Sequence, residues 1–117
     1  IPDRYRASGQ PVLIGGSMET GSYLLAGVSS GADAFYSTCH GSGRVMSRHQ
    51  AQSSFNGRDL QKRLEEQGIY ILTSSFPGLA EEAGGAYKDV DEVIQATEQG
   101  GLSRAVAKLL PVGNIKG

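Results

Sequence analysis

The chain has 117 residues, enough for at most one domain with a modest hydrophobic core. A net charge of −1 and a hydrophobic content of 38% fit a globular protein and exclude a disordered or fibrous one. No apolar run approaches the roughly 20 residues that span a bilayer, and a single cysteine cannot form an internal disulfide. We therefore expect a cytoplasmic protein with no membrane partner.

Short apolar runs near the start of the chain are typical of strands. Residues 11–14 and 23–28 form two such runs, and the polar segment 17–22 between them is expected to be a loop. A loop of small residues follows at positions 29–33. Residues 34–38 are then predicted to form a strand that leads into the next segment.

Two helices are predicted in the middle of the chain. The first extends over residues 44–53 and the second over residues 58–67. In the second helix, Leu60 and Leu64 are four apart and therefore share one buried face. Gly68 is expected to end this helix, because glycine readily takes the left-handed conformation found after a helix.

The last third of the chain combines a strand, a helix and an extended terminal segment. Residues 69–73 are rich in β-branched and aromatic side chains and predict a strand, while residues 76–78 indicate a turn. Asp89 is placed to cap a helix over residues 91–99. Residues 102–115 could form a short helix or a strand; the alternation of apolar side chains favours a strand, and Pro111 and Gly113 exclude a long helix. The sequence thus predicts an α+β fold with mixed strands and about three helices.

The chemically most distinctive run is Cys39-His40-Gly41-Ser42-Gly43, which is followed by Arg44 and Arg48. Its glycines allow positive φ angles and close approach to the backbone. If a helix begins near Gly43, the two arginines share one face and, with the N–H groups of the helix start, form an anion site. His40 beside that site could act on a phosphate as nucleophile, acid or base. The alternative is a glycine-rich turn that only caps a helix.

This run resembles the C-terminal part of the RtcB family of RNA-splicing ligases, whose active-site histidine lies in a Cys-His-Gly-x-Gly-Arg run. Residues 16–22 are similar to the family's Gly-Ser-Met-x-Thr-x-Ser, and residues 81–91 to its Glu-Glu-Ala-Pro-x-Ala-Tyr-Lys-Asp-Val-Asp. The final Lys116-Gly117 also resembles the family's end. Because family members are several times longer, the resemblance implies that residues 1–117 are one domain, a C-terminal fragment of the RtcB-type fold.

Two positions depart from the family pattern. Glu19 stands where a glycine is usual, and Gly84 replaces a proline. Because glycine restricts the backbone less than proline does, we expect the loop around Gly84 to be looser.

The resemblance implies a GTP- and manganese-dependent RNA ligase acting in tRNA splicing or RNA repair. It would join RNA 3′-phosphate or 2′,3′-cyclic phosphate ends to 5′-hydroxyl ends through GMP bonded to His40. Arg44 and Arg48 would bind phosphate or RNA. The residues expected around the nucleotide are Ser17, Ser22, Gly41, Ser42, Gly43, Tyr87 and Lys116. The implied partners are the RNA ends, the remaining N-terminal part of the ligase and an archease-type activator.

The metal ligands implied by the resemblance are expected outside this segment. His40, His49 and Cys39 are the only nitrogen or sulfur ligands, and their spacing is not that of a metal site. We therefore expect the isolated segment to be inactive, since phosphoryl chemistry on nucleotides needs a divalent cation.

Two other functions remain open. A non-catalytic nucleotide- or RNA-binding lobe without the metal site is the main alternative. A hydrolase with Cys39 as nucleophile and His40 as base is disfavoured, because sequence neighbours rarely meet in these roles and no orienting Asn or Asp is evident. For Ser17 and Ser22 the simpler interpretation is turn formation by side-chain hydroxyls, and for Lys116 it is a solvated chain end.

Overall fold

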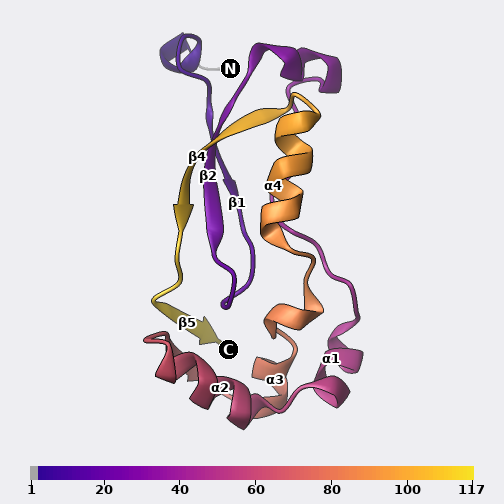
Figure 1. Ribbon diagram of the computed structural model, residues 1–117, viewed down its shortest axis with the longest axis vertical. Helices are drawn as coiled ribbons and strands as arrows, with labels where there is room; N and C mark the ends of the chain where they lie inside the picture. The colour runs from indigo at the N-terminus through magenta and orange to yellow at the C-terminus, as the bar shows by residue number, and fades with distance from the viewer. Residues whose placement is uncertain (1–2) are drawn as a thin grey trace.

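A three-stranded antiparallel sheet forms one end of the molecule. The computed structural model describes residues 3–117, and the sheet consists of β1 (Pro11–Ile14), β2 (Ser22–Gly27) and β4 (Ser103–Leu109) in the order β1-β2-β4. The helix α4 (Val90–Gln99) lies beside this sheet (Figure 1). Val90 and Ile94 of the helix pack against Ile14 and Leu25 of the sheet and make the first hydrophobic core.

Helices and a two-stranded parallel sheet form the other end (Figure 1). The helices are α1 (Arg48–Ser54), α2 (Gly57–Glu66) and α3 (Phe76–Ala80), and the strands are β3 (Tyr70–Thr73) and β5 (Gly113–Lys116). Their core consists of Met18, Leu60, Leu64, Ile69, Leu79 and Ala83. Met18 comes from the loop after β1, so this loop joins the two ends of an elongated molecule of 46 × 25 × 21 Å.

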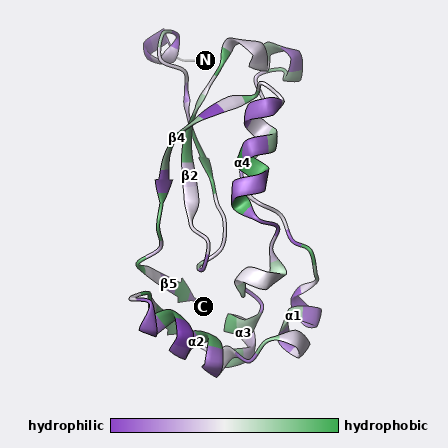
Figure 2. Ribbon diagram, viewed as in Figure 1, coloured by the Kyte–Doolittle hydropathy of each residue, from purple (hydrophilic) through white to green (hydrophobic). Residues whose placement is uncertain are grey.

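Local sequence explains where the longer helices begin and end. The Asn56 side chain accepts from the N–H groups of Arg58 and Asp59, and the Asp89 carboxylate accepts from the N–H of Asp91. Gly68 follows α2 with a φ of 83°. Figure 2 shows hydrophilic and hydrophobic residues alternating around α2 and α4, as the burial of one helix face requires.

The predicted α+β class is confirmed, and the predicted strands 11–14, 23–28 and 69–73 correspond to β1, β2 and β3. The terminal segment 102–115 is extended as predicted, but it divides into β4 and β5 around Pro111. Its second strand pairs in parallel with β3. The end of the chain is therefore built into the fold.

The prediction of a strand over residues 34–38 was wrong. A 3-10 helix, η2 (Ser29–Ala34), leads into a turn in which Phe35 and Tyr36 have φ angles of 55° and 58°. Both side chains are exposed, so no core holds the segment extended. The Tyr36 N–H instead donates to the Gly31 carbonyl at 2.8 Å and closes the turn.

Two helix boundaries also differ from prediction. The helix expected over residues 44–53 begins only at Arg48, because Ser47 caps it by accepting from the Gln50 N–H. The turn expected at 76–78 is the start of α3, where Pro77 fits the first helical turn and Ser75 is the cap. Residues 3–117 thus contain four α-helices, along with the short 3-10 helices η1 (Asp3–Tyr5), η2 and η3 (Gly84–Ala86).

Candidate functional site

Extended segments on both sides hold the backbone of the His40 loop. On one side, the Gly15 N–H donates to the His40 carbonyl at 3.1 Å, and the Ser42 N–H donates to the Gly15 carbonyl at 2.9 Å. On the other side, the Lys88 N–H donates to the Gly43 carbonyl at 2.9 Å, and the Val45 N–H donates to the Ala86 carbonyl at 2.9 Å. The loop therefore lies between the end of β1 and the segment that carries Tyr87.

This arrangement corrects the prediction of an anion site at a helix start near Gly43. Residues 43–45 are not helical and pair with residues 86–88 through two backbone hydrogen bonds and a bridge between Arg44 and Tyr87. Because α1 begins at Arg48, Arg44 lies outside it and the two arginines do not share a helix face. What the structure does bring together is the end of β1, the histidine loop and the 81–88 segment.

The His40 side chain is exposed at the surface of this loop. Among residues 3–117, its ring makes no hydrogen bond to another side chain or to the backbone, although its carbonyl is held by Gly15. The backbone at His40 is therefore held in place, while the imidazole ring is open to solvent. His49, the other histidine, is exposed on α1.

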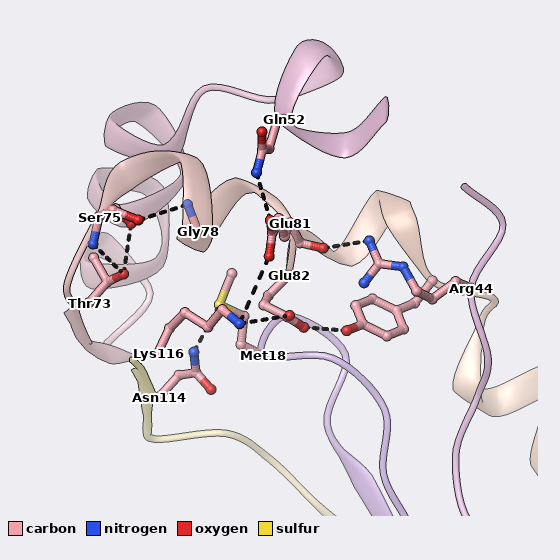
Figure 3. Close-up of polar contacts among 11 residues, drawn as sticks. Met18, Arg44, Gln52, Thr73, Ser75, Gly78, Glu81, Glu82, Asn114 and Lys116 are labelled. Atoms are coloured by element: carbon pink, nitrogen blue, oxygen red, sulfur yellow. Dashed lines mark hydrogen bonds and ion pairs between the residues drawn. The ribbon is translucent and has the colours of Figure 1, made fainter. Parts of the chain in front are cut away.

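Arg44 is engaged inside the protein. Its Nη2 donates to the Glu81 carbonyl at 2.6 Å (Figure 3). Its Nε donates to the Met46 carbonyl at 3.0 Å. The guanidinium carbon lies 4.7 Å from the centre of the Tyr87 ring, which is the geometry of a cation–π contact. Arg44 therefore fixes the ring of Tyr87, while Arg48 is exposed at the start of α1.

Two buried polar atoms of the segment that follows His40 have no partner among the described residues: the Ser42 hydroxyl and Nη1 of Arg44. Ser42 is only 5% exposed. Most buried polar groups in proteins are hydrogen-bonded, so these two atoms retain an unused capacity to form a hydrogen bond.

The carboxylate of Glu82 lies between Tyr87 and Lys116. The Tyr87 hydroxyl donates to Oε2 of Glu82, and Nζ of Lys116 lies 3.5 Å from Oε1 of Glu82 and 3.9 Å from Oε2 of Glu81 (Figure 3). The parallel pairing of β3 and β5 brings Lys116 there, and the Ser74 N–H donates to the Lys116 carbonyl at 3.0 Å. The simpler interpretation of Lys116 as a solvated chain end therefore does not hold, because its ammonium is folded back onto Glu82.

The ionisation of this group follows from its contacts. Burial favours the neutral form of Glu82, but the Tyr87 hydroxyl and the Lys116 ammonium outweigh it and hold the pKa of Glu82 below its ordinary value. Burial and the adjacent Glu82 carboxylate raise the pKa of Tyr87. Glu82 is therefore an anion that accepts from a neutral tyrosine and pairs with Lys116.

The two candidate serines have local partners. The Ser17 hydroxyl accepts from the N–H groups of Glu19 and Thr20, each at 3.2 Å, and the Ser22 hydroxyl accepts from the Gly16 N–H at 3.4 Å. These are the contacts of side-chain turn formation. A nucleotide-binding role for either serine stays a prediction.

Sequence reasoning gave no role to Glu19, Arg63 or Gly84. The Glu19 carboxylate accepts from the Gly84 N–H through Oε2 and from Nη2 of Arg63 through Oε1. Glu19 and Gly84 are the two departures from the family pattern, and this contact joins them. A proline at position 84 would lack the N–H that Glu19 accepts from. The two departures together were the only signal in the sequence that could have suggested this contact.

Within residues 3–117, no group of three or more His, Cys, Asp or Glu side chains is arranged to hold a metal ion. The expectation that the manganese ligands lie outside this segment stays a prediction. No helix in the same residues has the length and apolar character needed to cross a bilayer.

The chain is similar in sequence to a class of proteins named RNA-splicing ligases. The chain matches the family model described as tRNA-splicing ligase RtcB over residues 1–117. It is 53% identical over 117 residues to the RNA-splicing ligase RtcB of Mycobacterium tuberculosis, covering 100% of this chain and 27% of that protein. It is 47% identical over 118 residues to the tRNA-splicing ligase RtcB of Thermococcus kodakarensis, covering 24% of that protein.

A further relative, the tRNA-splicing ligase RtcB of Pyrococcus furiosus, is 48% identical over 118 residues, which are 12% of its length. The chain belongs to the RtcB family, as its motifs predicted. It spans about a quarter or less of the length of these relatives.

Proposed function

We propose that this chain is the nucleotide-binding part of an RNA ligase that joins 3′-phosphate or 2′,3′-cyclic phosphate ends to 5′-hydroxyl ends. The proposal rests on one observation in this chain, which belongs to the RtcB family: backbone hydrogen bonds hold three of its segments together. The end of β1, the His40 loop and the 86–88 segment are held side by side, with His40 exposed among them. A histidine fixed by its backbone and accessible through its ring suits a nucleophile.

In the proposed first step, an unprotonated nitrogen of His40 attacks the α-phosphorus of GTP. A phosphorus–nitrogen bond forms, the bond between the α-phosphorus and the bridging oxygen breaks, and pyrophosphate leaves. GMP then passes from His40 to the RNA 3′-phosphate. The RNA 5′-hydroxyl then attacks the phosphorus of this 3′-phosphate, which GMP has activated. GMP leaves, and the two RNA ends are joined by a phosphodiester. A 2′,3′-cyclic end is first opened by water to give the 3′-phosphate.

The described residues supply positioning for these steps. Tyr87, with its ring fixed by Arg44, and Lys116, held by Glu82, are proposed to contact the guanine base. Ser17, Ser22 and the Gly41-Ser42-Gly43 backbone are proposed to line the nucleotide, and the buried Ser42 hydroxyl without a partner supports this. Exposed Arg48 is proposed to bind RNA phosphate.

The remaining components are proposed to lie outside this chain. They are the manganese ligands, the N-terminal part of the ligase and an archease-type activator. Manganese would stabilise the negative charge on the transferring phosphate. We propose that the isolated chain does not ligate RNA.

The experiment is mass spectrometry of the full-length protein after incubation with GTP and Mn²⁺. We expect GMP bound to His40 and no adduct in His40→Ala, with His49→Ala as the matched control that still forms it. GMP on His49 or on a lysine would contradict the proposed nucleophile. GTP binding without any adduct would favour the non-catalytic nucleotide-binding lobe.

A further inference from the structure

The Glu19 carboxylate connects three separate segments of the chain. Glu19 lies in the turn after β1, where the Thr20 and Gly21 N–H groups both donate to the Ser17 carbonyl. Oε2 of Glu19 accepts from the N–H of Gly84, at the start of η3, and Oε1 accepts from Arg63 on α2. Only 19% of the Glu19 side chain is exposed. Both of its oxygens are therefore used inside the protein.

The contact with Gly84 is specific to glycine at that position. A Cβ added to Gly84 would lie 2.5 Å from Oε2 and 3.0 Å from Cβ and Cδ of Glu19. Such distances require the carboxylate to move. Glu19 and Gly84 therefore depend on each other: one supplies the acceptor, and the other supplies both the donor and the space.

The position of this contact relates it to the nucleotide-binding segments. Gly84 begins η3 (Gly84–Ala86), and Tyr87 follows η3 directly. On the other side of the contact, Glu19 shares its turn with Ser17. The carboxylate thus sets the position of the serine turn relative to Tyr87 and to the Glu82 group that holds Lys116.

The fold has a separate anchor for the same turn. Met18 is 7% exposed and packs among Leu60, Leu64 and Leu79 in the second core. This apolar contact keeps the turn on the protein without help from Glu19. Loss of the Glu19 carboxylate should therefore change the alignment of the turn more than it changes folding.

We propose that Glu19 is a positioning residue for the nucleotide, which fixes the serine turn against the Tyr87 segment through the Gly84 N–H. This inference rests on the proposed nucleotide-binding function. The ion pair of Glu19 with Arg63 contributes less to this positioning than the hydrogen bond to Gly84 does, because the Arg63 side chain is 54% exposed and exposed ion pairs are weak.

The first experiment measures GMP transfer to His40 in the full-length protein as a function of GTP concentration. We expect Glu19→Gly to raise the KM for GTP about tenfold, the effect of losing one charge-assisted hydrogen bond, with little change in the rate at saturating GTP. Glu19→Gln keeps an acceptor for the Gly84 N–H and should restore most of the affinity. Arg63→Ala should have a smaller effect, and Glu66→Gln, an exposed carboxylate on the same helix, should have none.

The second experiment uses proline at position 84. Ala83 has a ψ of 141° and Gly84 is the first residue of a 3-10 helix, so the backbone accepts proline there. Gly84→Pro should raise the KM in the wild-type protein, where the ring meets the Glu19 carboxylate. It should have much less effect when combined with Glu19→Gly. Equal effects of Gly84→Pro in the two backgrounds would overturn the inference.

Amide hydrogen exchange separates this inference from the proposed function. We expect the Gly84 amide to be protected in the wild type and exposed to exchange in Glu19→Gly, whether or not GMP transfer occurs. An unprotected Gly84 amide in the wild type would overturn the contact itself. If the wild type shows protection but forms no adduct on His40, the proposed function fails and the contact stands.

Discussion

The Glu82 carboxylate joins the Tyr87 hydroxyl, which donates to Oε2, to the Lys116 ammonium, which lies 3.5 Å from Oε1. Tyr87 follows η3, and Lys116 is the last residue of β5, so one carboxylate fixes two distant segments. Glu82 itself lies between them, just after α3 (Figure 3). The two side chains proposed to bind guanine are therefore held in place before any nucleotide binds.

Removal of the Glu82 carboxylate should affect both side chains at once. We expect Glu82→Ala to destabilise the protein by about 1–3 kcal/mol, because a partly buried charged acceptor with two partners is lost. Glu82→Gln retains an acceptor for the Tyr87 hydroxyl and should cost less. The measurement is the apparent melting temperature of the full-length protein, with Glu66→Gln as the control for loss of an exposed carboxylate. Equal stability of Glu82→Ala and the wild type would contradict this role.

The contacts of Glu82 with Tyr87 and Lys116 also predict that the stability of the protein depends on pH. The pKa of Glu82 is lower in the folded protein than its ordinary value of 4.5, so at lower pH the unfolded chain takes up this proton more readily. The stabilisation is complete above the ordinary pKa and is lost as the pH falls through the lower folded value. Between about pH 6 and about pH 3 the melting temperature of the wild type should fall further than that of Glu82→Gln. Parallel curves for the two proteins would show that Glu82 does not titrate in this way.

The two arginines of the histidine segment should behave differently when each is replaced by alanine. Arg44 donates to two carbonyls and covers Tyr87, so Arg44→Ala should destabilise the protein by about 1–3 kcal/mol. Arg48 is exposed on α1, and Arg48→Ala should leave the melting temperature unchanged while reducing the rate of RNA joining. Melting curves and ligation rates of the full-length variants separate the two effects. A stable Arg44→Ala protein, or one with Arg48→Ala that ligates normally, would contradict the assignment.

The contrast between these arginines shows what the sequence could predict. A spacing of four residues indicates a shared helix face only if the helix includes both positions. Here Ser47 caps α1, which begins at Arg48, so Arg44 lies outside the helix. Local signals such as Gly68 and Asp89 identified helix ends correctly, because capping depends on neighbouring residues. The pairing of residues 43–45 with 86–88 depends on contacts between distant segments, which a single sequence does not display.

For the candidate site, too, the sequence indicated individual residues but not the contacts between distant segments. Family motifs indicated the His40 loop, Tyr87 and Lys116, but they did not indicate that Glu82 joins the last two. The residues of the Glu19 contact are at positions 19, 63 and 84, with no periodicity to relate them. Side-chain contacts between loops therefore had to come from the structure, whereas the periodic face of α2 could be identified from Leu60 and Leu64 alone.

Lys116 provides the sharpest test of nucleotide selectivity. Its ammonium is paired with Glu82 and its side chain is only 28% exposed, so it is positioned by the fold and by a counter-charge. An ammonium can donate to the O6 and N7 acceptors on one edge of guanine, whereas adenine presents an amino group in place of O6. Lys116→Met keeps the pairing of β5 with β3, including the carbonyl that accepts from Ser74, and removes only the charge.

We expect Lys116→Met to reduce GMP transfer from GTP to His40 at least about tenfold, since one charge-assisted hydrogen bond is lost. The preference for GTP over ATP should weaken in the same variant, because the lost donor distinguishes the two bases. Adduct formation is measured with each nucleotide in the full-length protein, and Lys62→Met, an exposed lysine on α2, is the matched control. Unchanged labelling with GTP in Lys116→Met would show that the lysine serves only to pair with Glu82 and does not contact the base.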